Sequence, residues 1–296
     1  MSQNEIEDIG SLKALTKLAK LFLSGNRITD LSPLKPLSNM EHLYIGGNRI
    51  SDLRALEGMT QMRSLYAGAN QIKDLDPLKK LTNLDVLDLK SNLVYDLGPL
   101  KFLKNLSYLD LYNNRVWNLD PIRNLRFDKY YDTGALIFTL QLDHNYLDLR
   151  STTKTYQLLN KLNGEGYLRT QLKAQRLVIG STNAYVGESA FKLSTAPFIS
   201  SSRTYVPIRF VSERLGSKVS WNQSKKEVTI QKNNTTIRWI VNEKKAIVNG
   251  QTVSFDTPLL LKKGSTFVPV RFVSELLEST VEFMVNPKTV IIFEKK

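Results

Sequence analysis

The stretch LAKLFLSGNRITDLSPL (residues 18–34) decides the fold of the first half of the chain, because its frame returns again and again. The frame reads L-x-x-L-x-L-x-x-N-x-I-x-D-L, with Asn26 at a polar position of fixed identity. The same frame recurs with a period of 22 residues, at Asn26, Asn48, Asn70, Asn92 and Asn114. Such a period indicates a stacked array in which each repeat buries its leucines only against its neighbours.

The array extends over residues 1–150. Asn4 opens the frame, and Asn145 closes it after a step of 31 residues, which implies a nine-residue insertion near residues 126–135. The L-x-L pair places two side chains inward from a short strand, and the amide of the following Asn can bond backbone groups of the neighbouring turn. Pairs such as Asp76–Pro77 predict a capping side chain followed by proline at the start of a short helix. Each repeat is therefore expected to form one strand and one short helix.

An acidic column runs beside the asparagines, at Asp30, Asp52, Asp74 and Asp96. It admits two interpretations, a ladder of calcium ligands or local hydrogen bonding at each turn, and the second is the prediction. With this frame, the first half resembles the leucine-rich repeats of the internalin and phosphatase-regulator type. The resemblance implies an α/β solenoid of short parallel strands and short helices.

The concave face of that solenoid holds the candidate binding residues. Alternation along each strand exposes the residue between the two inward leucines and its outer neighbours. The predicted partner-binding residues on this face are Phe22, His42, Tyr44, Tyr66, Asp88, Tyr108, Asp110 and Tyr112. Adjacent aromatic rings about 4.8 Å apart would form an apolar strip. The strip could recognise a protein or glycan partner, helped by accessible backbone at Gly46 and Gly68, or it could only stiffen the sheet.

Both ends of the array carry expectations. Residues 151–174 are predicted to form a closing helix and linker, because Tyr156, Leu158, Leu159 and Leu162 have helical spacing before Gly164 and Gly166. At the start, Met1 enters partway through a repeat, which predicts a truncated array or a fragment of a longer product. The N-terminus has no signal-peptide pattern.

Charge separates the two halves of the chain. Residues 1–150 carry 19 Lys and Arg against 18 Asp and Glu, whereas residues 151–296 carry 22 against 10, so the net charges are +1 and +12. The basic half should favour anionic partners at low salt, such as an anionic cell-wall polymer. Nucleic acid is disfavoured as the partner because no recognisable binding motif with exposed aromatic residues is present.

Residues 175–296 hold one phrase written twice. VPIRFVSERLGSKVSW (residues 206–221) returns 62 residues later as VPVRFVSELLESTVEF (residues 268–283). Each copy predicts antiparallel strands and one short helix, with Pro207 and Pro269 where a strand turns into the helix. Arg209 with Glu213, and Arg271 with Glu275, are four residues apart and are predicted to be structural ion pairs.

The duplicated phrase resembles the copper amine oxidase N-terminal domain, which occurs as a stalk on surface proteins of Gram-positive-type bacteria. The resemblance implies an α+β domain of two units, each a five-stranded antiparallel sheet around a helix. The second copy departs from the pattern with Glu278 at the place of Gly216, which puts its turn in doubt. The resemblance also implies an extracellular or cell-wall location.

Catalysis is not indicated. The chain has no cysteine and only two histidines, His42 and His144, both in the repeat array, so a copper site with imidazole ligands cannot be assembled. No cofactor or metal is expected, and no apolar run is long enough to span a membrane.

The sequence therefore predicts a non-enzymatic surface or secreted binding protein, with a repeat array that recognises a partner and a basic stalk or wall-associating domain. The alternative is an intracellular regulator that binds an enzyme through the array. A signal peptide encoded upstream of Met1 would exclude that alternative.

Overall fold

The computed structural model describes residues 4–127, 140–161, 171, 174–285 and 287–295. The chain divides into two units, Met1–Gln171 and Leu172–Lys296, which are described separately below. From residue 128 onward the predicted insertion lies outside the described residues, as do the predicted stop glycines of the closing helix.

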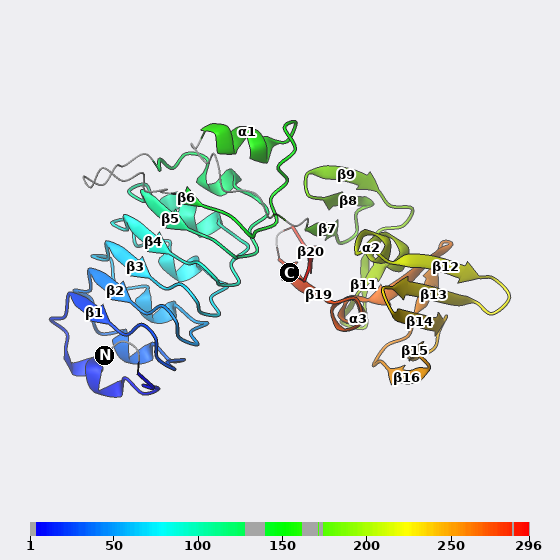
Figure 1. The fold of residues 1–296 in the computed structure, drawn as a ribbon, viewed down its shortest axis with the longest axis horizontal. Helices are drawn as coiled ribbons and strands as arrows, with labels where there is room; N and C mark the ends of the chain where they lie inside the picture. Colours follow the sequence, from blue (N-terminus) through cyan, green and yellow to red (C-terminus); the bar gives the residue numbers. More distant parts are fainter. Residues whose placement is uncertain (1–3, 128–139, 162–170, 172–173, 286, 296) are drawn as a thin grey trace. The chain divides into compact units, whose positions relative to one another are not determined.

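The first unit contains a parallel sheet of six short strands in sequence order (Figure 1). Its strands are β1 (Lys20–Phe22), β2 (His42–Tyr44), β3 (Ser64–Tyr66), β4 (Val86–Asp88), β5 (Tyr108–Asp110) and β6 (Leu140–Gln141). Equivalent leucines pair along the sheet, beginning with Leu21 opposite Leu43 and Leu43 opposite Leu65. These leucines belong to one continuous core that runs through the whole array, so each strand depends on its neighbours for burial.

Short 3-10 helices alternate with the strands and form the layer opposite the sheet (Figure 1). They are η1 (Gly10–Ala14), η2 (Ser32–Leu34), η3 (Arg54–Leu56), η4 (Asp76–Leu78), η5 (Gly98–Phe102) and η6 (Asp120–Ile122). The predicted cap at Asp76 is wrong, because Asp76 is the first residue of η4 and makes no capping hydrogen bond. Instead Asp74 Oδ1 accepts the backbone N–H of Asp76 at 2.9 Å.

The same bond occurs through the whole acidic column, which confirms the prediction of local hydrogen bonding. Asp30, Asp52 and Asp96 each accept the backbone N–H two residues further on, at 2.8 Å. A carboxylate two residues ahead of the helix satisfies a donor that the first turn leaves without an intrahelical partner.

The repeated asparagines join adjacent turns. Asn48 Oδ1 accepts the N–H of Ile28 at 3.0 Å, and Asn48 Nδ2 donates to the carbonyls of Leu23 and Ile45 at 3.0 Å each. Every later repeat makes the same three bonds, through Asn70, Asn92, Asn114 and Asn145. One amide therefore satisfies backbone groups of two turns that no helix or strand would satisfy.

Gln171 adds a last rung to this ladder. Its Oε1 accepts the N–H of Leu147 at 3.2 Å and its Nε2 donates to the carbonyl of Leu142 at 2.9 Å. These two groups are the ones that a further Asn would bond in the repeat pattern. Helix α1 (Lys154–Lys161) lies at the same end, where Leu159 is buried in the core of the array. This helix occupies the place predicted for the closing helix.

The second unit is built from the two copies of the duplicated phrase. The first copy forms β7 (Gln175–Val178), β8 (Asn183–Val186), β9 (Ser189–Lys192), β10 (Phe198–Ser200), β11 (Arg203–Pro207), α2 (Ile208–Arg214), β12 (Lys218–Asn222) and β13 (Glu227–Lys232). The second copy forms β14 (Thr235–Ile240), β15 (Lys245–Val248), β16 (Gln251–Ser254), β17 (Leu260–Lys262), β18 (Ser265–Pro269), α3 (Val270–Leu276), β19 (Ser279–Met284) and β20 (Thr289–Glu294).

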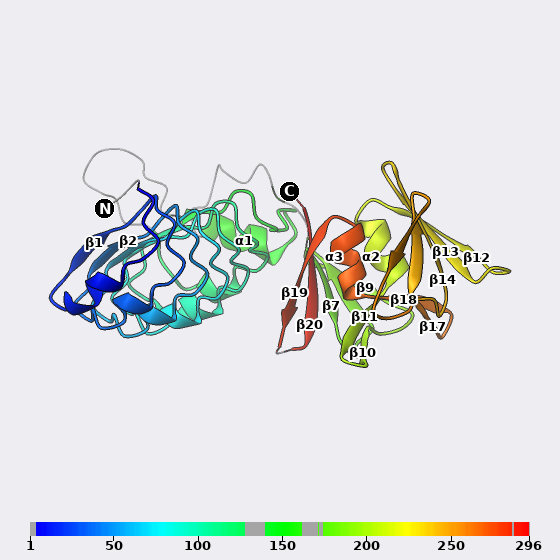
Figure 2. The same ribbon diagram turned by 90° about the horizontal axis from the view of Figure 1, so that it is seen from below.

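The prediction that each copy forms its own sheet around its helix is wrong, because the sheets are shared. One sheet has the order β12-β13-β14-β15-β16, another β19-β20-β7-β8-β9, and a third β10-β11-β18-β17 (Figure 2). In the third sheet Val206 of the first copy lies opposite Val268, its equivalent in the second copy. The two copies are thus related by an approximate two-fold axis at this pair. Strands of each copy complete a sheet of the other.

The helices of the duplicated phrase belong to the shared core. Both α2 and α3 contact β11 and β18, and Val211 and Phe272 are completely buried. The turn after α3, which the sequence put in doubt, has the same kind of backbone conformation as the turn after α2. Glu278 has a φ of 49° and Gly216 a φ of 82°, so both adopt the left-handed conformation.

No helix in the described part of the chain has the length and apolar character needed to cross a membrane.

Candidate functional site

The outer surface of the parallel sheet carries the aromatic residues predicted from the sequence. Phe22, Tyr44 and Tyr66 lie at equivalent positions of β1, β2 and β3, and we call these three side chains the aromatic strip. The ring centroids of Phe22 and Tyr44 are 4.4 Å apart, and those of Tyr44 and Tyr66 are 4.7 Å apart with an interplanar angle of 5°. Phe22 remains 45% exposed, and both tyrosines are half-buried. The strip is an ordered stack with open edges.

Lys20 extends over the start of the aromatic strip. Its Nζ lies 5.0 Å from the centre of the Phe22 ring and 5.8 Å from that of Tyr44, distances at which a cation is attracted to an aromatic ring. The predicted access to backbone beside the strip is not found at Gly68, which is buried. A Cβ on Gly68 would lie 2.8 Å from Lys90 Cγ and 2.9 Å from Asp88 Oδ1, so this glycine makes room for its neighbours.

Asp88 and Asp110 occupy the positions of β4 and β5 that are equivalent to the aromatic strip, and their carboxylates turn toward the backbone. Asp88 and Asp110 are only 8% and 7% exposed. Asp88 Oδ1 accepts the N–H of Lys90 at 3.0 Å, and Asp110 Oδ1 accepts the N–H of Tyr112 at 2.9 Å. Burial raises the pKa of Asp110 above its ordinary value, the hydrogen bond from Tyr112 opposes this rise, and the nearby charge of Asp88 adds to it. Burial and these hydrogen bonds leave little of either carboxylate open to a partner.

The remaining predicted sheet residues lie on the same face. His42 Nδ1 is 3.2 Å from Ser64 Oγ. Tyr108 is half-buried, whereas Tyr112 is exposed and its ring centre lies 4.9 Å from that of His144. The structure therefore places the aromatic strip on β1–β3 and two further tyrosines on or just after β5, the strand that also carries Asp110.

The ion pairs of the duplicated phrase are exposed and differ between the two copies. Arg271 Nε donates to Glu275 Oε1 at 2.5 Å, whereas Arg209 Nε lies 4.0 Å from Glu213 Oε1. Pro207 and Pro269 end β11 and β18 and immediately precede the two helices. Arg209 is thus held less closely by its own helix than its equivalent is.

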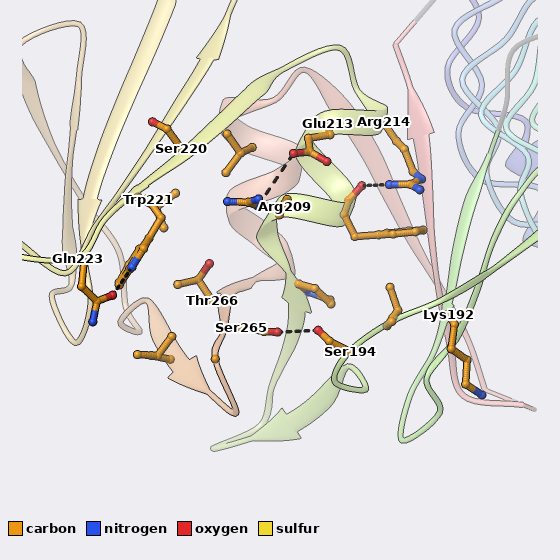
Figure 3. Close-up of a pocket in the computed structure, with 17 residues that line it drawn as sticks. Lys192, Ser194, Arg209, Glu213, Arg214, Ser220, Trp221, Gln223, Ser265 and Thr266 are labelled. Carbon is orange, nitrogen blue, oxygen red and sulfur yellow. Dashed lines mark hydrogen bonds and ion pairs between the residues drawn. The ribbon is translucent and has the colours of Figure 1, made fainter.

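A cleft of about 670 Å³ lies beside Arg209 in the second unit (Figure 3). Its lining comes from α2, from the edge strand β12, and from the second copy's β17–β18 hairpin. Trp221 forms one side, with its indole Nε1 donating to Gln223 Oε1 at 2.7 Å, and Thr266 lies between Trp221 and the hydroxyl pair of Ser194 and Ser265 (Figure 3). The Oγ atoms of that pair are 2.8 Å apart.

Charge in the cleft is mainly positive. Lys192, Arg209 and Arg214 line it together with a single acidic residue, Glu213. The guanidinium of Arg214 lies 3.9 Å from the centre of the Phe210 ring, and its partial burial lowers its pKa from the ordinary value. Arg214 therefore belongs to the wall, whereas the side chain of Arg209 is 60% exposed.

The sequence pattern singles out Arg209 and Glu213 as an ion pair but gives no indication of the cleft around them. Ser194 and Ser265 are 71 residues apart and come from different copies, so no local motif joins them. A comparison of the copies does offer a signal, because Ser194 and Ser265 correspond to Asp256 and Arg203 in the 62-residue register. Among the described residues, no group of three or more His, Cys, Asp or Glu side chains is placed to hold a metal ion.

Family models match both halves of the chain. The model described as Leucine Rich repeats (2 copies) matches residues 1–36, 38–80 and 82–124. The Copper amine oxidase N-terminal domain matches residues 164–223 and 185–292. The search of curated proteins found no significant match.

Solved structures resemble part of the chain. Internalin C2 from Listeria monocytogenes is 33% identical, with a TM-score of 0.45, over 54% of this chain and 64% of that one. The internalin inlF from the same organism is 26% identical, with a TM-score of 0.39, over 57% of this chain and 58% of that one. A plant peptide hormone receptor, RGFR1, in complex with RGF2, is 21% identical, with a TM-score of 0.40, over 47% of this chain and 22% of that one. The chain thus spans less than two thirds of the length of each of these proteins.

The 22-residue frame, the asparagine ladder and the duplicated phrase agree with these two family models. Residues 1–124 therefore contain leucine-rich repeats, and residues 164–292 match the copper amine oxidase N-terminal domain.

Proposed function

We propose that the chain is a non-enzymatic binding protein whose aromatic strip recognises a protein partner. The observation that carries this proposal is the ordered stack of Phe22, Tyr44 and Tyr66 on the outer surface of the sheet. Aromatic side chains supply much of the binding energy at protein interfaces. Because the rings are already stacked, association would cost less side-chain entropy than ordering three free aromatic residues.

Stacking and recognition are compatible roles of the aromatic strip. The interplanar angles of 18° and 5° leave Tyr44 enclosed between Phe22 and Tyr66, so both of its faces are covered. A pyranose ring packs its C–H groups on an open aromatic face, whereas a protein side chain can also pack against ring edges. This geometry favours a protein over a glycan as the partner of the strip.

The second unit supplies a different kind of attraction. Its half of the chain, residues 151–296, has a net charge of +12. We infer from this charge that it acts as a stalk or wall-associating module on a secreted or surface-exposed protein. Its binding to purified teichoic acid should weaken steeply between low and high salt, since the attraction depends on screened charges. Salt-independent binding, or none, would argue for a spacer alone.

The strip can be tested with two aromatic substitutions in the full chain. Immobilised protein is used to select binders from a displayed random-peptide library, and the affinity of the selected peptides is then measured. Tyr44→Ala and Tyr66→Ala should each weaken binding by about 30-fold, the effect of losing an aromatic residue that dominates an interface. Far-UV circular dichroism checks that the repeat fold persists.

Phe102→Ala provides the matched control. Phe102 is an aromatic residue about as exposed as Phe22, at 49% against 45%, but it lies on η5 in the layer opposite the sheet. The control should bind the selected peptides as the unmodified protein does. Equal affinity of the Tyr44 and Tyr66 variants would leave the strip with a stiffening role only.

A further inference from the structure

The cleft beside Arg209 occurs at a position where the two copies of the duplicated phrase differ. Arg203 Nε of the first copy donates to Asp256 Oδ2 of the second copy at 2.8 Å, which bridges the two copies with an ion pair. The positions equivalent to Arg203 and Asp256 are Ser265 of the second copy and Ser194 of the first, whose hydroxyl oxygens are 2.8 Å apart. The ion pair and the two hydroxyls thus make the same bridge about the approximate two-fold axis. The hydroxyl bridge is the smaller one and leaves room for the cleft.

Other positions at the cleft also differ between the two copies. Leu193 corresponds to Phe255, which stacks on Trp239 at 4.5 Å and packs against Phe272 at 5.7 Å. The larger side chain thus occupies space on the side of the second copy. Trp221 corresponds to Phe283, so only the first copy has an indole at this position.

Arg209 is the cation with the greatest freedom to meet a ligand. It lies 4.0 Å from Glu213, while the equivalent Arg271 is bound to Glu275 at 2.5 Å. Arg214 is engaged differently, because it packs on Phe210 and donates from Nη1 to the carbonyl of Phe210 at 3.3 Å. A planar guanidinium that its neighbour holds only loosely can donate two parallel hydrogen bonds to a carboxylate.

From these features we propose that the cleft binds an acidic oligosaccharide, with a carboxylate-bearing pyranose on Arg209 and a sugar ring beside Trp221. An indole offers a flat apolar surface to sugar C–H groups. Gln223, Glu213 and the hydroxyls of Ser194, Ser265 and Thr266 offer donors and acceptors to sugar hydroxyls. The volume of about 670 Å³ falls in the usual range for small-molecule sites.

This inference goes beyond the proposed function. It does not involve the aromatic strip. Net charge alone does not say which part of the second unit binds an anion, whereas this proposal assigns that binding to named residues. A failure of the strip to bind peptides would leave the cleft untouched, and the reverse also holds.

The test uses the full chain and three defined probes. A hyaluronan hexasaccharide provides glucuronate, chitohexaose provides a neutral pyranose chain, and inorganic polyphosphate provides charge without sugar. Binding is followed by the indole N–H resonance of Trp221 in 15N-labelled protein, assigned by its disappearance in Trp221→Phe. We expect saturable shifts with hyaluronan and no saturable shift with polyphosphate. The dissociation constant for chitohexaose should be at least ten times higher than that for hyaluronan.

Two variants test the assigned residues. Arg209→Gln should weaken hyaluronan binding by about 10-fold or more, the effect of losing a charge-assisted pair. The double variant Ser194→Asp with Ser265→Arg replaces the hydroxyl pair with an ion pair of the Arg203–Asp256 kind and should abolish binding. Because that double variant could fold poorly, the exposed substitution Arg209→Gln decides the outcome.

Arg271→Gln removes the same charge from the equivalent position and serves as the matched control. It should bind hyaluronan as the unmodified protein does. Equal weakening in Arg209→Gln and Arg271→Gln would overturn the proposal, because it would show attraction to overall charge. A shift of the Trp221 resonance that is as strong with polyphosphate or chitohexaose, or absent with all three probes, would also overturn it.

Discussion

Among single residues, Asp110 makes the stability of the first unit depend on pH. Its carboxylate is 7% exposed and lies near the charge of Asp88. Burial raises its pKa, so the folded state prefers the protonated form more than the unfolded chain does. The stability that Asp110 contributes is therefore complete at pH values below its unfolded pKa of ~3.9 and is lost as the pH rises through the higher folded pKa.

Asp110→Asn should remove the loss of stability that Asp110 causes as the pH rises. The amide keeps an Oδ1 acceptor for the N–H of Tyr112 but carries no charge. The variant is expected to have a higher thermal midpoint than the unmodified protein at pH 7, and the difference should shrink as the pH approaches 3. Thermal unfolding of the full chain at a series of pH values measures this. A constant difference at all pH values would contradict the assignment.

Asp30→Asn provides a control of opposite sign. Hydrogen bonds from the hydroxyl and the backbone N–H of Ser32 lower the pKa of Asp30, which is exposed. Its stabilising effect is present above the ordinary aspartate pKa and is lost as the pH falls through the lowered value. This variant should therefore be less stable than the unmodified protein at pH 7, with the difference closing in acid.

At the scale of elements, the asparagine ladder holds successive turns in register. Asn114 is 1% exposed, its Oδ1 accepts the N–H of Val94, and its Nδ2 donates to the carbonyl of Leu89. Asn114→Ala leaves both groups buried without this partner, and each costs about 1–3 kcal/mol. We expect a loss of roughly 3–5 kcal/mol in the free energy of unfolding of the array, with faster amide exchange at Val94.

The matched control for Asn114 is Asn105→Ala. Asn105 Nδ2 also donates to the carbonyl of the preceding repeat, Thr82, at 2.9 Å, but it is exposed. Water can replace this bond, so the cost should be about 1 kcal/mol or less. Hydrogen exchange and urea unfolding of the two variants measure the difference. Similar losses would mean that burial does not set the strength of the ladder.

The ladder also marks how far sequence reasoning reaches. The fixed spacing of Asn26 and its equivalents predicts the strands, the inward leucines and the outer aromatic column, because the same local physics repeats in every turn. Gln171 escapes this reasoning, since a longer side chain completes the last rung outside the 22-residue period. The burial of Asp88 and Asp110 also escapes it, because each carboxylate turns back to accept the backbone N–H two residues further on, from Lys90 and Tyr112.

At the scale of the molecule, pairing between the two copies could not be predicted from the sequence. Equivalent strands have nearly the same side-chain pattern, so pairing within a copy and pairing between copies satisfy the pattern equally well. The structure pairs β20 of the second copy with β7 of the first, and β13 of the first copy with β14 of the second, so each copy contributes strands to a sheet of the other. The cleft beside Arg209 escaped prediction for the same reason, since Ser194 and Ser265 meet only through this exchange.

Shared sheets predict that the two copies unfold together. Phe272 in the second copy is completely buried and packs against Trp239 at 5.0 Å. Phe272→Ala should cost about 3–5 kcal/mol through lost burial and a cavity. Because β7, β8 and β9 of the first copy depend on β20, their amides should lose protection together with those of the second copy.

Hydrogen–deuterium exchange of the full chain tests this coupling. Phe283→Ala, which removes an exposed ring from β19 of the same copy, should leave protection in β7–β9 unchanged. If Phe272→Ala loosens only β14–β20, the copies open independently despite their shared sheets. Joint loss of protection would instead make the duplicated domain one folding unit, in which the bridge at Ser194 and Ser265 depends on the core around Phe272 as much as on its own neighbours.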